Sequence, residues 1–293
     1  MDDKVLIISG ATACGKSDLA MKIAEEKDIA IINADSLQIY EGLPILSSQP
    51  SNIDQIKVNH YLYSYLKPDQ SCSVAIWLNL VNQKIEEIKE AKKIPVIVGG
   101  TGLYIAKLID GINEIPQISL INKELAKSLF SELGKEKFAK KFLLTEKLDK
   151  QRLIRSAEVI LETGKNIDFW QQQPKKKILL DNSFIHLNLN PSREIIYNNC
   201  NQRFTKMLDK GVINEVKNLN DKIPENSQIG KTIGFYEIVD FINKKISFEE
   251  MKSMITKKTR NYAKRQLTWF RHQFKEILFF SNDQEIIKFI KQL

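Results

Sequence analysis

The sequence is poor in the residues that mark secreted, metal-binding and membrane proteins. Its 293 residues include three cysteines, Cys14, Cys72 and Cys200, which are too scattered for a disulfide framework or a zinc quartet. No apolar run approaches the roughly 20 residues that cross a bilayer, and the first residues carry no signal-peptide pattern. We therefore expect a protein of the reducing cytoplasm that is neither secreted nor anchored in a membrane.

Acidic residues are also fewer than basic ones. Asp and Glu number 36 against 44 Lys and Arg, so the net charge is +8 and the sequence pI is about 9.1. This excess favours an anionic partner, which could be a nucleic acid, a phosphorylated small molecule or an acidic membrane surface. Hydrophobic residues make up 43%, an ordinary globular share that excludes bulk disorder.

The first hundred residues alternate short apolar runs with helical patterns. The runs at 5–9, 29–34 and 95–98 show no polar alternation, and the segments 18–26 and 74–91 have helical spacing. Unalternating strands separated by helices indicate a parallel sheet that is covered on both faces. Ligands of such α/β sheets bind at the carboxyl ends of the strands.

A helical stretch interrupts this pattern. Strand signals vanish between residues 116 and 177, and we interpret this segment as an all-helical insertion into a core formed by residues 1–115 and 178–293. A fourth strand follows, at 178–180 or centred on 186–189. The other predicted helices span 122–133, 135–142, 149–163, 192–217, 236–243, 247–274 and 284–291.

A phosphate-binding motif lies between the first strand and the first helix. The run Gly10-Ala11-Thr12-Ala13-Cys14-Gly15-Lys16-Ser17 fits G-x-x-x-x-G-K-[ST]. Its backbone N–H groups and the helix N-terminus suit a di- or triphosphate, Lys16 would neutralise an outer phosphate, and Ser17 could help to hold Mg²⁺. No apolar run ends in the acidic pair that a hydrolysing NTPase would need for its metal. The motif thus indicates a bound diphosphate group more strongly than it indicates ATP.

Asp35 follows the second strand and should face the same crevice as Lys16. In this position it could serve as a metal ligand or a general base. Gln38 and Tyr40 add an amide and a ring suited to a heterocyclic base, and Thr101 adds a hydroxyl from the next strand.

The segment 257–275 has one basic and one aromatic face. At 100° per residue, Arg260, Lys264 and Arg271 share a stripe without acidic residues, whereas Tyr262, Trp269 and other aromatics occupy the opposite side. Ordinary surfaces mix charges, so this stripe predicts contact with a phosphate backbone, and the aromatic side predicts a core face.

Five motifs, in this order, resemble those of the tRNA dimethylallyltransferase (tRNA isopentenyltransferase, or IPP transferase) family. They are residues 10–17, 35–40, 98–104, 151–155 and 259–271. The resemblance covers nearly the whole chain. It implies a P-loop kinase-like core with a helical insertion, and an enzyme that uses Mg²⁺. The implied reaction transfers the dimethylallyl group of dimethylallyl diphosphate to N6 of the adenosine 3′-adjacent to the anticodon of a tRNA.

The resemblance also assigns site residues. It implies catalytic roles for Asp35, Thr101 and Arg203, donor binding by the loop 10–17 and a metal contact by Ser17. The implied contacts to the tRNA anticodon stem-loop are Asp35, Ser36, Leu37, Gln38, Thr101, Gln151, Arg152, Leu153, Ile154, Arg155, Lys231, Arg260, Lys264 and Arg271. We expect a monomer. Gln49, Asn199 and Tyr236 depart from the family's basic residues at their positions, which affects the expected tRNA contacts more than the reaction.

Three other functions remain compatible with these residues. An adenylate isopentenyltransferase would alkylate a free nucleotide, but it would need neither the insertion nor the basic stripe. A small-molecule P-loop kinase would bind ATP tightly. A nucleotide-gated RNA-binding module would leave Asp35 replaceable.

Overall fold

The computed structural model describes residues 4–224, 227–274 and 276–292. The chain divides into two compact units: a core unit, Met1–Ile109 with Ile178–Leu293, and an insertion unit, Asp110–Lys177. The insertion unit begins ahead of the predicted residue 116. The reason is β5 (Ile112–Asn113), which pairs antiparallel with β6 (Lys175–Lys176).

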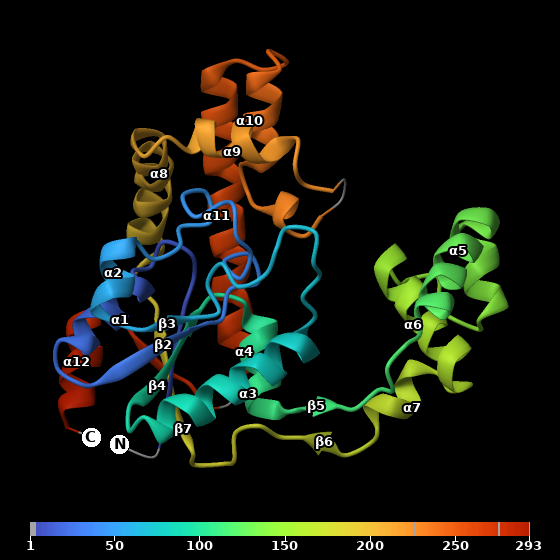
Figure 1. Cartoon of the computed structure of the whole chain (residues 1–293), viewed down its shortest axis with the longest axis horizontal. Coiled ribbons are helices and arrows are strands. Elements are labelled where there is room, and N and C mark those ends of the chain that lie inside the picture. Colours follow the sequence, from blue (N-terminus) through green and yellow to red (C-terminus); the bar gives the residue numbers. More distant parts are fainter. Residues whose placement is uncertain (1–3, 225–226, 275, 293) are drawn as a thin grey trace. The chain divides into compact units, whose positions relative to one another are not determined.

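The core unit contains a six-stranded sheet whose strands are all parallel (Figure 1). Its spatial order is β3 (His60–Tyr61), β2 (Ile29–Asn33), β4 (Ile94–Gly99), β1 (Val5–Ser9), β7 (Phe184–Leu189) and β8 (Leu278–Phe280). Every residue of β1, β2 and β4 is buried, because their side chains are apolar on both faces and helices cover the sheet. The predicted parallel α/β core is therefore confirmed.

Helices occupy the remaining core unit. They are α1 (Lys16–Ala24), α2 (Asn52–Lys57), α3 (Val74–Glu90), α4 (Gly102–Asp110), α8 (Arg193–Asp209), α9 (Val212–Asn220), α10 (Phe235–Ile242), α11 (Phe248–Gln273) and α12 (Asp283–Lys291), with a short 3₁₀ turn at Ile229–Lys231. Of all the described helices, none is long and apolar enough to cross a membrane.

One sequence prediction in the core unit was wrong, and one that left two alternatives is now decided. For the fourth strand, the alternative centred on 186–189 is confirmed by β7, and 178–180 is not a strand. The predicted helix 192–217 is two helices, because the chain turns at Gly211 with a φ of 86°, a left-handed conformation that glycine adopts without steric cost. Edge strands β3 and β8 carry too few residues for a periodic signal.

The insertion unit consists of α5 (Leu120–Lys141), α6 (Lys150–Thr163) and α7 (Ile167–Gln171) together with the β5–β6 ribbon. Gly134 has a φ of 70° inside α5, so the helix is interrupted where two helices were predicted. Ala126, Phe138 and Leu153 belong to a small apolar core of this unit. Strand signals are absent here, as expected, but the insertion is not all-helical: the two lysines of β6 become a strand by pairing with β5 and not by their own propensity.

Candidate active site

The phosphate-binding motif forms the turn between β1 and α1, at the carboxyl edge of the sheet. Ala13 has a φ of 63° and Gly15 has a φ of 98°, and Gly15 precedes the first helical residue without a side-chain cap. The first N–H groups of α1 are therefore left for an external acceptor. Gly10 must lack a side chain, since a Cβ there would lie 2.5 Å from the Leu189 carbonyl oxygen.

Two cations at this loop are held by neutral acceptors. Lys16 Nζ donates to the Ala11 carbonyl oxygen at 2.7 Å, and Arg203 Nη1 donates to Thr12 Oγ1 at 3.1 Å. Burial lowers the pKa of Arg203, whereas the nearby Asp35 carboxylate raises it. Because neither of these acceptors is charged, both side chains keep positive charge available for an anion.

Gln266 of α11 links this loop to the end of β4. Its side chain is buried, its Oε1 accepts from Thr12 N at 2.8 Å, and its Nε2 donates to the Gly100 carbonyl oxygen at 2.7 Å. The Thr12 N–H group thus donates within the protein, while the N–H groups at the start of α1 stay available for an external acceptor. This role could not be predicted from the sequence, because Gln266 lies on the predicted aromatic face of its helix.

Asp35 lies in a turn fixed by its neighbours. Asn33 Oδ1 accepts from Asp35 N at 2.8 Å, and Asp35 Oδ1 accepts from Leu37 N at 2.9 Å. Asn33 also donates to the carbonyl oxygens of Asp35 and Leu62. Among the described residues, Asp35 Oδ2 has no hydrogen-bond partner, and Asp35 lines the cleft described below.

Other predicted residues around Asp35 have structural contacts. Thr101 Oγ1 accepts from Ser36 N at 3.0 Å, and Thr101 is not among the cleft-lining residues. Gln38 does line the cleft, but its Nε2 donates to the carbonyl oxygens of Ser47 and Ser48. The expectation that Tyr40 holds a base was wrong, since Tyr40 is 1% exposed and packs in the core.

A cleft of about 820 Å³ opens over the phosphate-binding loop. It is lined by Lys16, Ser17 and Asp35 from one side and by Arg203 of α8 from another. A smaller cavity of about 70 Å³ shares Thr12, Asp35 and Arg203 with it. The wall of this cavity is largely apolar and includes Leu46, Phe204, Met207, Ile233 and Ile255.

The electrostatic environment places Asp35 at the centre of this region. Burial raises the pKa of Tyr63, Tyr104 and Tyr262, and the Asp35 carboxylate adds to the rise in each. These phenols therefore stay neutral at physiological pH. The same Asp35 carboxylate raises the pKa of the Arg203 guanidinium.

A loop of the cleft is anchored by a residue that the motifs did not include. Glu215 of α9 accepts from Ile45 N at 2.6 Å and from Leu46 N at 2.8 Å. Burial raises the pKa of Glu215, and the two N–H groups oppose that rise. Gln49 belongs to the same loop region and donates to the Tyr40 carbonyl oxygen, so its contact in this structure is internal.

The basic stripe of α11 faces solvent only in part. Lys264 and Arg271 are exposed, whereas Arg260 is partly buried and its Nη1 donates to Asn201 Oδ1 at 3.1 Å. The predicted aromatic core face is confirmed at Phe270, which is 1% exposed, but Trp269 is 40% exposed and lies against Gly102. Lys231 is exposed at the end of the 3₁₀ turn, and Tyr236 is exposed in α10.

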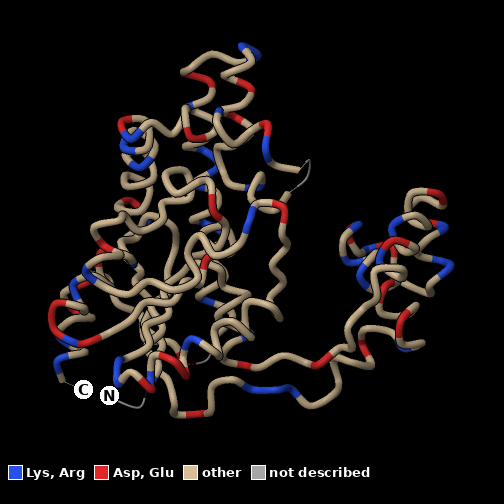
Figure 2. The backbone as a smooth tube through the Cα atoms, viewed as in Figure 1, with Lys and Arg blue, Asp and Glu red and all other residues tan. Residues whose placement is uncertain are grey.

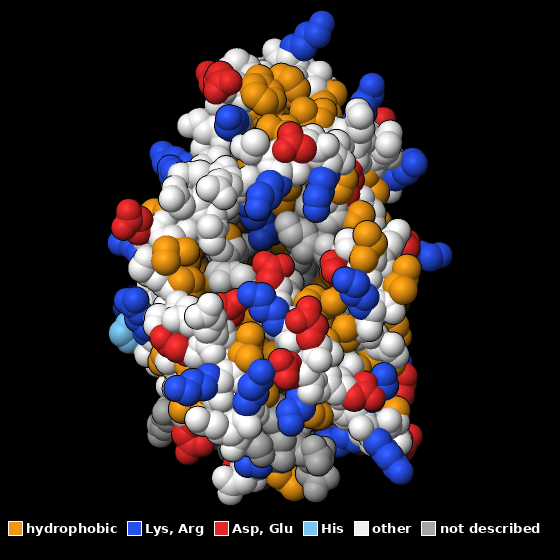
Figure 3. All heavy atoms as spheres, turned by 90° about the vertical axis from the view of Figure 1, so that its left-hand side faces the viewer, with side chains coloured by type: hydrophobic (Ala, Val, Ile, Leu, Met, Phe, Trp, Pro, Cys, Tyr) orange, Lys and Arg blue, Asp and Glu red, His pale blue; other side chains and the backbone are white. Residues whose placement is uncertain are grey.

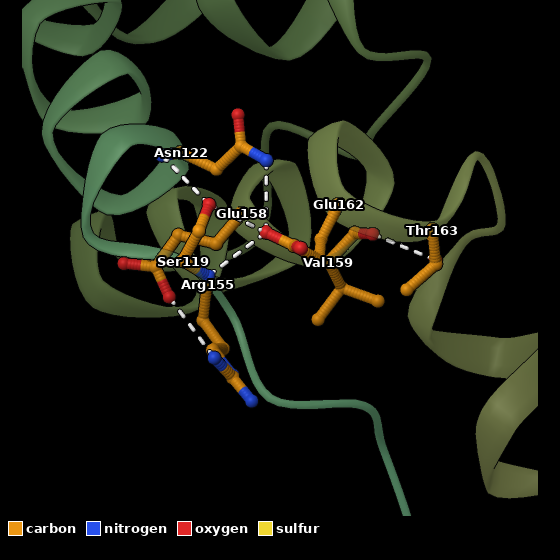
Figure 4. A network of polar contacts seen from close by, with 7 residues as sticks. All are labelled: Ser119, Asn122, Arg155, Glu158, Val159, Glu162 and Thr163. Carbon is orange, nitrogen blue, oxygen red and sulfur yellow. Dashed lines mark hydrogen bonds and ion pairs between the residues drawn. The ribbon is translucent and has the colours of Figure 1, made fainter.

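The family segment of the insertion unit begins α6. Asp149 caps the helix by accepting from Arg152 N, and Arg155 Nη1 donates to Glu158 Oε2 at 3.1 Å (Figure 4). Gln151 and Arg152 are exposed, while Ile154 is half-buried. Leu153 is 0% exposed in the core of this unit, so its side chain is unavailable for the tRNA contact expected of it. Lys and Arg recur along the helices of this unit (Figure 2).

Metal-ligating side chains do not gather in the part of the chain that the structure describes: it contains no group of three His, Cys, Asp or Glu suited to a metal ion. Ser17 and Asp18 do line the cleft at the start of α1. A divalent ion here would thus need oxygen ligands from a bound diphosphate in addition to Ser17.

Comparisons with known proteins agree with this geometry. Residues 38–273 match the family model described as IPP transferase, and residues 3–69 match that of isopentenyl transferase. A tRNA dimethylallyltransferase from Ehrlichia chaffeensis is 37% identical over 99% of this chain and 97% of its own.

Solved structures agree as well. The tRNA isopentenylpyrophosphate transferase of Bacillus halodurans has a TM-score of 0.71 at 27% identity, covering 99% of this chain and 96% of its own. A eukaryotic dimethylallyltransferase, captured acting on tRNA, shares the fold with a TM-score of 0.80 at 23% identity, over 99% of this chain and 80% of that one. The chain therefore belongs to the IPP transferase family.

Proposed function

We propose that the chain transfers the dimethylallyl group of dimethylallyl diphosphate to N6 of the adenosine 3′-adjacent to the anticodon of a tRNA, releasing diphosphate. One observation carries the proposal: Thr12, Asp35 and Arg203 line both the cleft and the apolar cavity. A phosphate-binding loop, a carboxylate and a guanidinium thus open onto one space. Family membership supplies the substrate class.

Asp35 acts as the general base in this reaction. The exocyclic amine of adenine is a poor nucleophile, because its lone pair is conjugated into the ring. As N6 bonds to the first allyl carbon, its proton passes to the carboxylate, whose Oδ1 is already held by Leu37 N. Oδ2 is the oxygen that has no hydrogen-bond partner among the described residues and is suited to accept the proton.

The phosphate-binding loop stabilises the leaving group. When the bond between the allyl carbon and the diphosphate oxygen breaks, its electron pair leaves with diphosphate. The N–H groups at the start of α1 together with Lys16 and Arg203 then face the growing negative charge. In this reaction nothing is phosphorylated, which agrees with the missing acidic pair. The apolar wall of the small cavity suits the five-carbon tail.

Mg²⁺ fits the site as a partner of the diphosphate. Ser17 would hold it together with phosphate oxygens, and the ion would supply further neutralisation of the leaving group. We further propose that the enzyme acts as a monomer. We place the reaction in the cytoplasm, where its tRNA substrate is found.

The tRNA is bound by cationic and polar side chains of both units. The exposed Lys264, Arg271 and Lys231 of the core unit, and Gln151 and Arg152 of the insertion unit, are the proposed contacts. The target adenosine must leave the stack of its loop before its N6 can reach Asp35.

The decisive experiment offers labelled dimethylallyl diphosphate together with unmodified tRNA, AMP or neither, and labelled ATP in parallel. Label that appears in tRNA and in digested N6-isopentenyladenosine supports the proposal. Label in AMP but not in tRNA would instead indicate an adenylate isopentenyltransferase, and phosphate transfer from ATP would indicate a kinase. Binding of tRNA without any transfer would indicate an RNA-binding module.

A further inference from the structure

One wall of the cleft carries more cations than the transfer step uses. This wall is a face of α8, whose cleft-lining residues follow one another at helical spacing: Asn199, Gln202, Arg203, Lys206, Met207 and Lys210. Arg203 contacts Thr12 of the phosphate-binding loop. Lys206 and Lys210 are exposed, and the transfer reaction assigns them no role.

The three cations form a row that leads away from the loop. With a rise of 1.5 Å per residue, Lys206 lies about 4.5 Å and Lys210 about 10 Å beyond Arg203 along the helix axis. Among the described residues, neither lysine is paired with a carboxylate. The positive charge of the row is therefore uncompensated inside the protein.

The carboxylates of the cleft lie on other elements. Asp18 belongs to α1, Asp35 follows β2 and Asp54 belongs to α2. In the space-filling view of this side of the molecule, Lys and Arg side chains lie above the central hollow, and acidic and basic side chains mix below it (Figure 3). The charged residues of α8 that line the cleft are therefore all cations, whereas the phosphate-binding side carries Lys16 together with Asp18 and Asp35.

Helix stability alone does not explain the row. Lysines near the carboxyl end of a helix interact favourably with its dipole, which accounts for their presence on the last turn. The dipole does not explain why these two lysines line the cleft, whereas Asp209 on the same turn does not. Like charges four residues apart, such as Lys206 and Lys210, repel each other and destabilise a helix. A visiting anion would relieve that repulsion.

We propose that Lys206 and Lys210 form an entry track for the diphosphate group of the prenyl donor and steer it to Arg203 and the phosphate-binding loop. The proposal rests on the proposed function and names the route by which that substrate arrives. An anion that moves along this row ends at the loop. A terminal diphosphate can reach that point, whereas a phosphodiester with ribose on both sides cannot enter the turn.

The test removes both charges with Lys206→Gln/Lys210→Gln. The matched control, Lys217→Gln/Lys288→Gln, makes the same change at exposed lysines of α9 and α12 that are not cleft residues. At saturating tRNA and low salt, we expect the KM for dimethylallyl diphosphate to rise about tenfold in the test variant, with kcat within about twofold. At high salt the difference should shrink, because screening weakens steering. The control should behave like the unaltered protein.

Titration with inorganic diphosphate provides a readout that needs no turnover. Its affinity should fall in the test variant by about the same factor as KM rises, while tRNA affinity stays unchanged. Unaltered KM, salt dependence and diphosphate affinity would overturn the proposal, and so would weaker tRNA binding with an unchanged donor KM. If the double variant does not fold, Lys206→Gln alone carries the same test with a smaller effect. Failure of the proposed function is separate, since the unaltered protein would then transfer no label whatever the diphosphate titration shows.

Discussion

The Asp35 turn of the core unit and the start of α6 in the insertion unit both carry family motifs, but the fold holds them differently. The carboxyl edge of the sheet is fixed over long sequence distances, for example by Gln266 on Thr12 and by Thr101 on Ser36. The polar contacts of α6 at this point are local, with Arg152 and Arg155 each pairing three residues away. Residues remote from the motif should therefore affect the first site strongly and the second weakly.

The largest effect should come from the carboxylate itself. Asp35→Asn keeps an oxygen for the Leu37 N–H but removes the proton acceptor, so we expect the single-turnover rate of prenyl transfer to fall by about 10³-fold or more. Affinity for tRNA should stay within a few-fold, because a base acts mainly in the transition state. Rapid-quench assays and filter binding measure the two quantities. Asp28→Asn, at an exposed aspartate outside the cleft, serves as control; an equal rate in both variants would remove Asp35 from the mechanism.

Gln266→Met should have the next largest effect. The apolar side chain fills a similar volume but leaves the Thr12 N–H and the Gly100 carbonyl without their partner. We expect kcat/KM for the donor to fall by about 10- to 100-fold, and the free energy of unfolding to fall by about 1–3 kcal/mol. Steady-state kinetics and urea unfolding check both.

The control for Gln266 is Gln273→Met, at the exposed end of the same helix. It should leave both quantities unchanged. A Gln266 variant that loses stability yet keeps its donor kcat/KM would show that the residue supports α11 and not the phosphate-binding loop.

The pH dependence of the Glu215 contact also tests how a residue far along the chain affects the site. Its pKa is raised by burial, so the folded state binds its proton more tightly than the unfolded state does. Its contribution to stability is therefore present below the unfolded pKa and is lost as pH rises through the folded pKa. On acidification, Glu215 takes up a proton before ordinary glutamates do, and an acceptor for Ile45 N or Leu46 N is lost.

Glu215→Gln imitates that protonated state. We expect a donor KM raised by about threefold to tenfold at neutral pH, as one loop contact is removed. In the unaltered protein KM should rise as pH falls, while in the variant it should depend less on pH. The difference in unfolding free energy between the unaltered protein and the variant should favour the unaltered protein more at acidic than at neutral pH. Glu90→Gln on the exposed side of α3 is the control, and an identical KM–pH profile in the Glu215 variant would contradict the loop assignment.

This contrast also explains which features the sequence could predict. Apolar runs predicted β1, β2 and β4 because both faces of a central strand are buried, and the glycine-bracketed motif predicted the phosphate-binding turn. β3, β5, β6 and β8 are two or three residues long and form through pairing, which leaves no periodic pattern.

The site residues divide in the same way. Lys16 and Asp35 were predictable because their roles depend on the local turn. Gln266 and Glu215 were not, since each contacts the site from a helix far along the chain, and an amide or carboxylate on an amphipathic helix is ordinarily a surface residue. Conversely, motif membership assigned a tRNA contact to Leu153, whose side chain packs in a core.

On the RNA side, Arg260→Ala with Lys264→Ala should weaken tRNA binding by about tenfold at moderate salt. Each lost phosphate contact should also reduce the salt dependence of binding by about one unit of slope. Filter binding over a salt series measures this effect. Lys252→Ala with Arg265→Ala, on other faces of the same helix, is the charge-matched comparison, and equal losses in both pairs would show that only the net charge of α11 matters.

The smallest effect should come from Arg152→Ala in the insertion unit. Its ion pair with Asp149 is 3.6 Å long and both side chains are mostly exposed, so the stability of the unit should be essentially unchanged. We expect a twofold to fivefold loss of tRNA affinity (about 0.4–1 kcal/mol), of the size of one exposed phosphate contact. Lys147→Ala, ahead of the helix, should have no effect of this kind. The neighbouring Leu153→Ala should instead lower the free energy of unfolding by about 2–5 kcal/mol, because it removes a buried side chain. If Arg152→Ala destabilised the unit as Leu153→Ala does, the segment would be a packing motif, and the polar contacts of Arg152 would not be merely local.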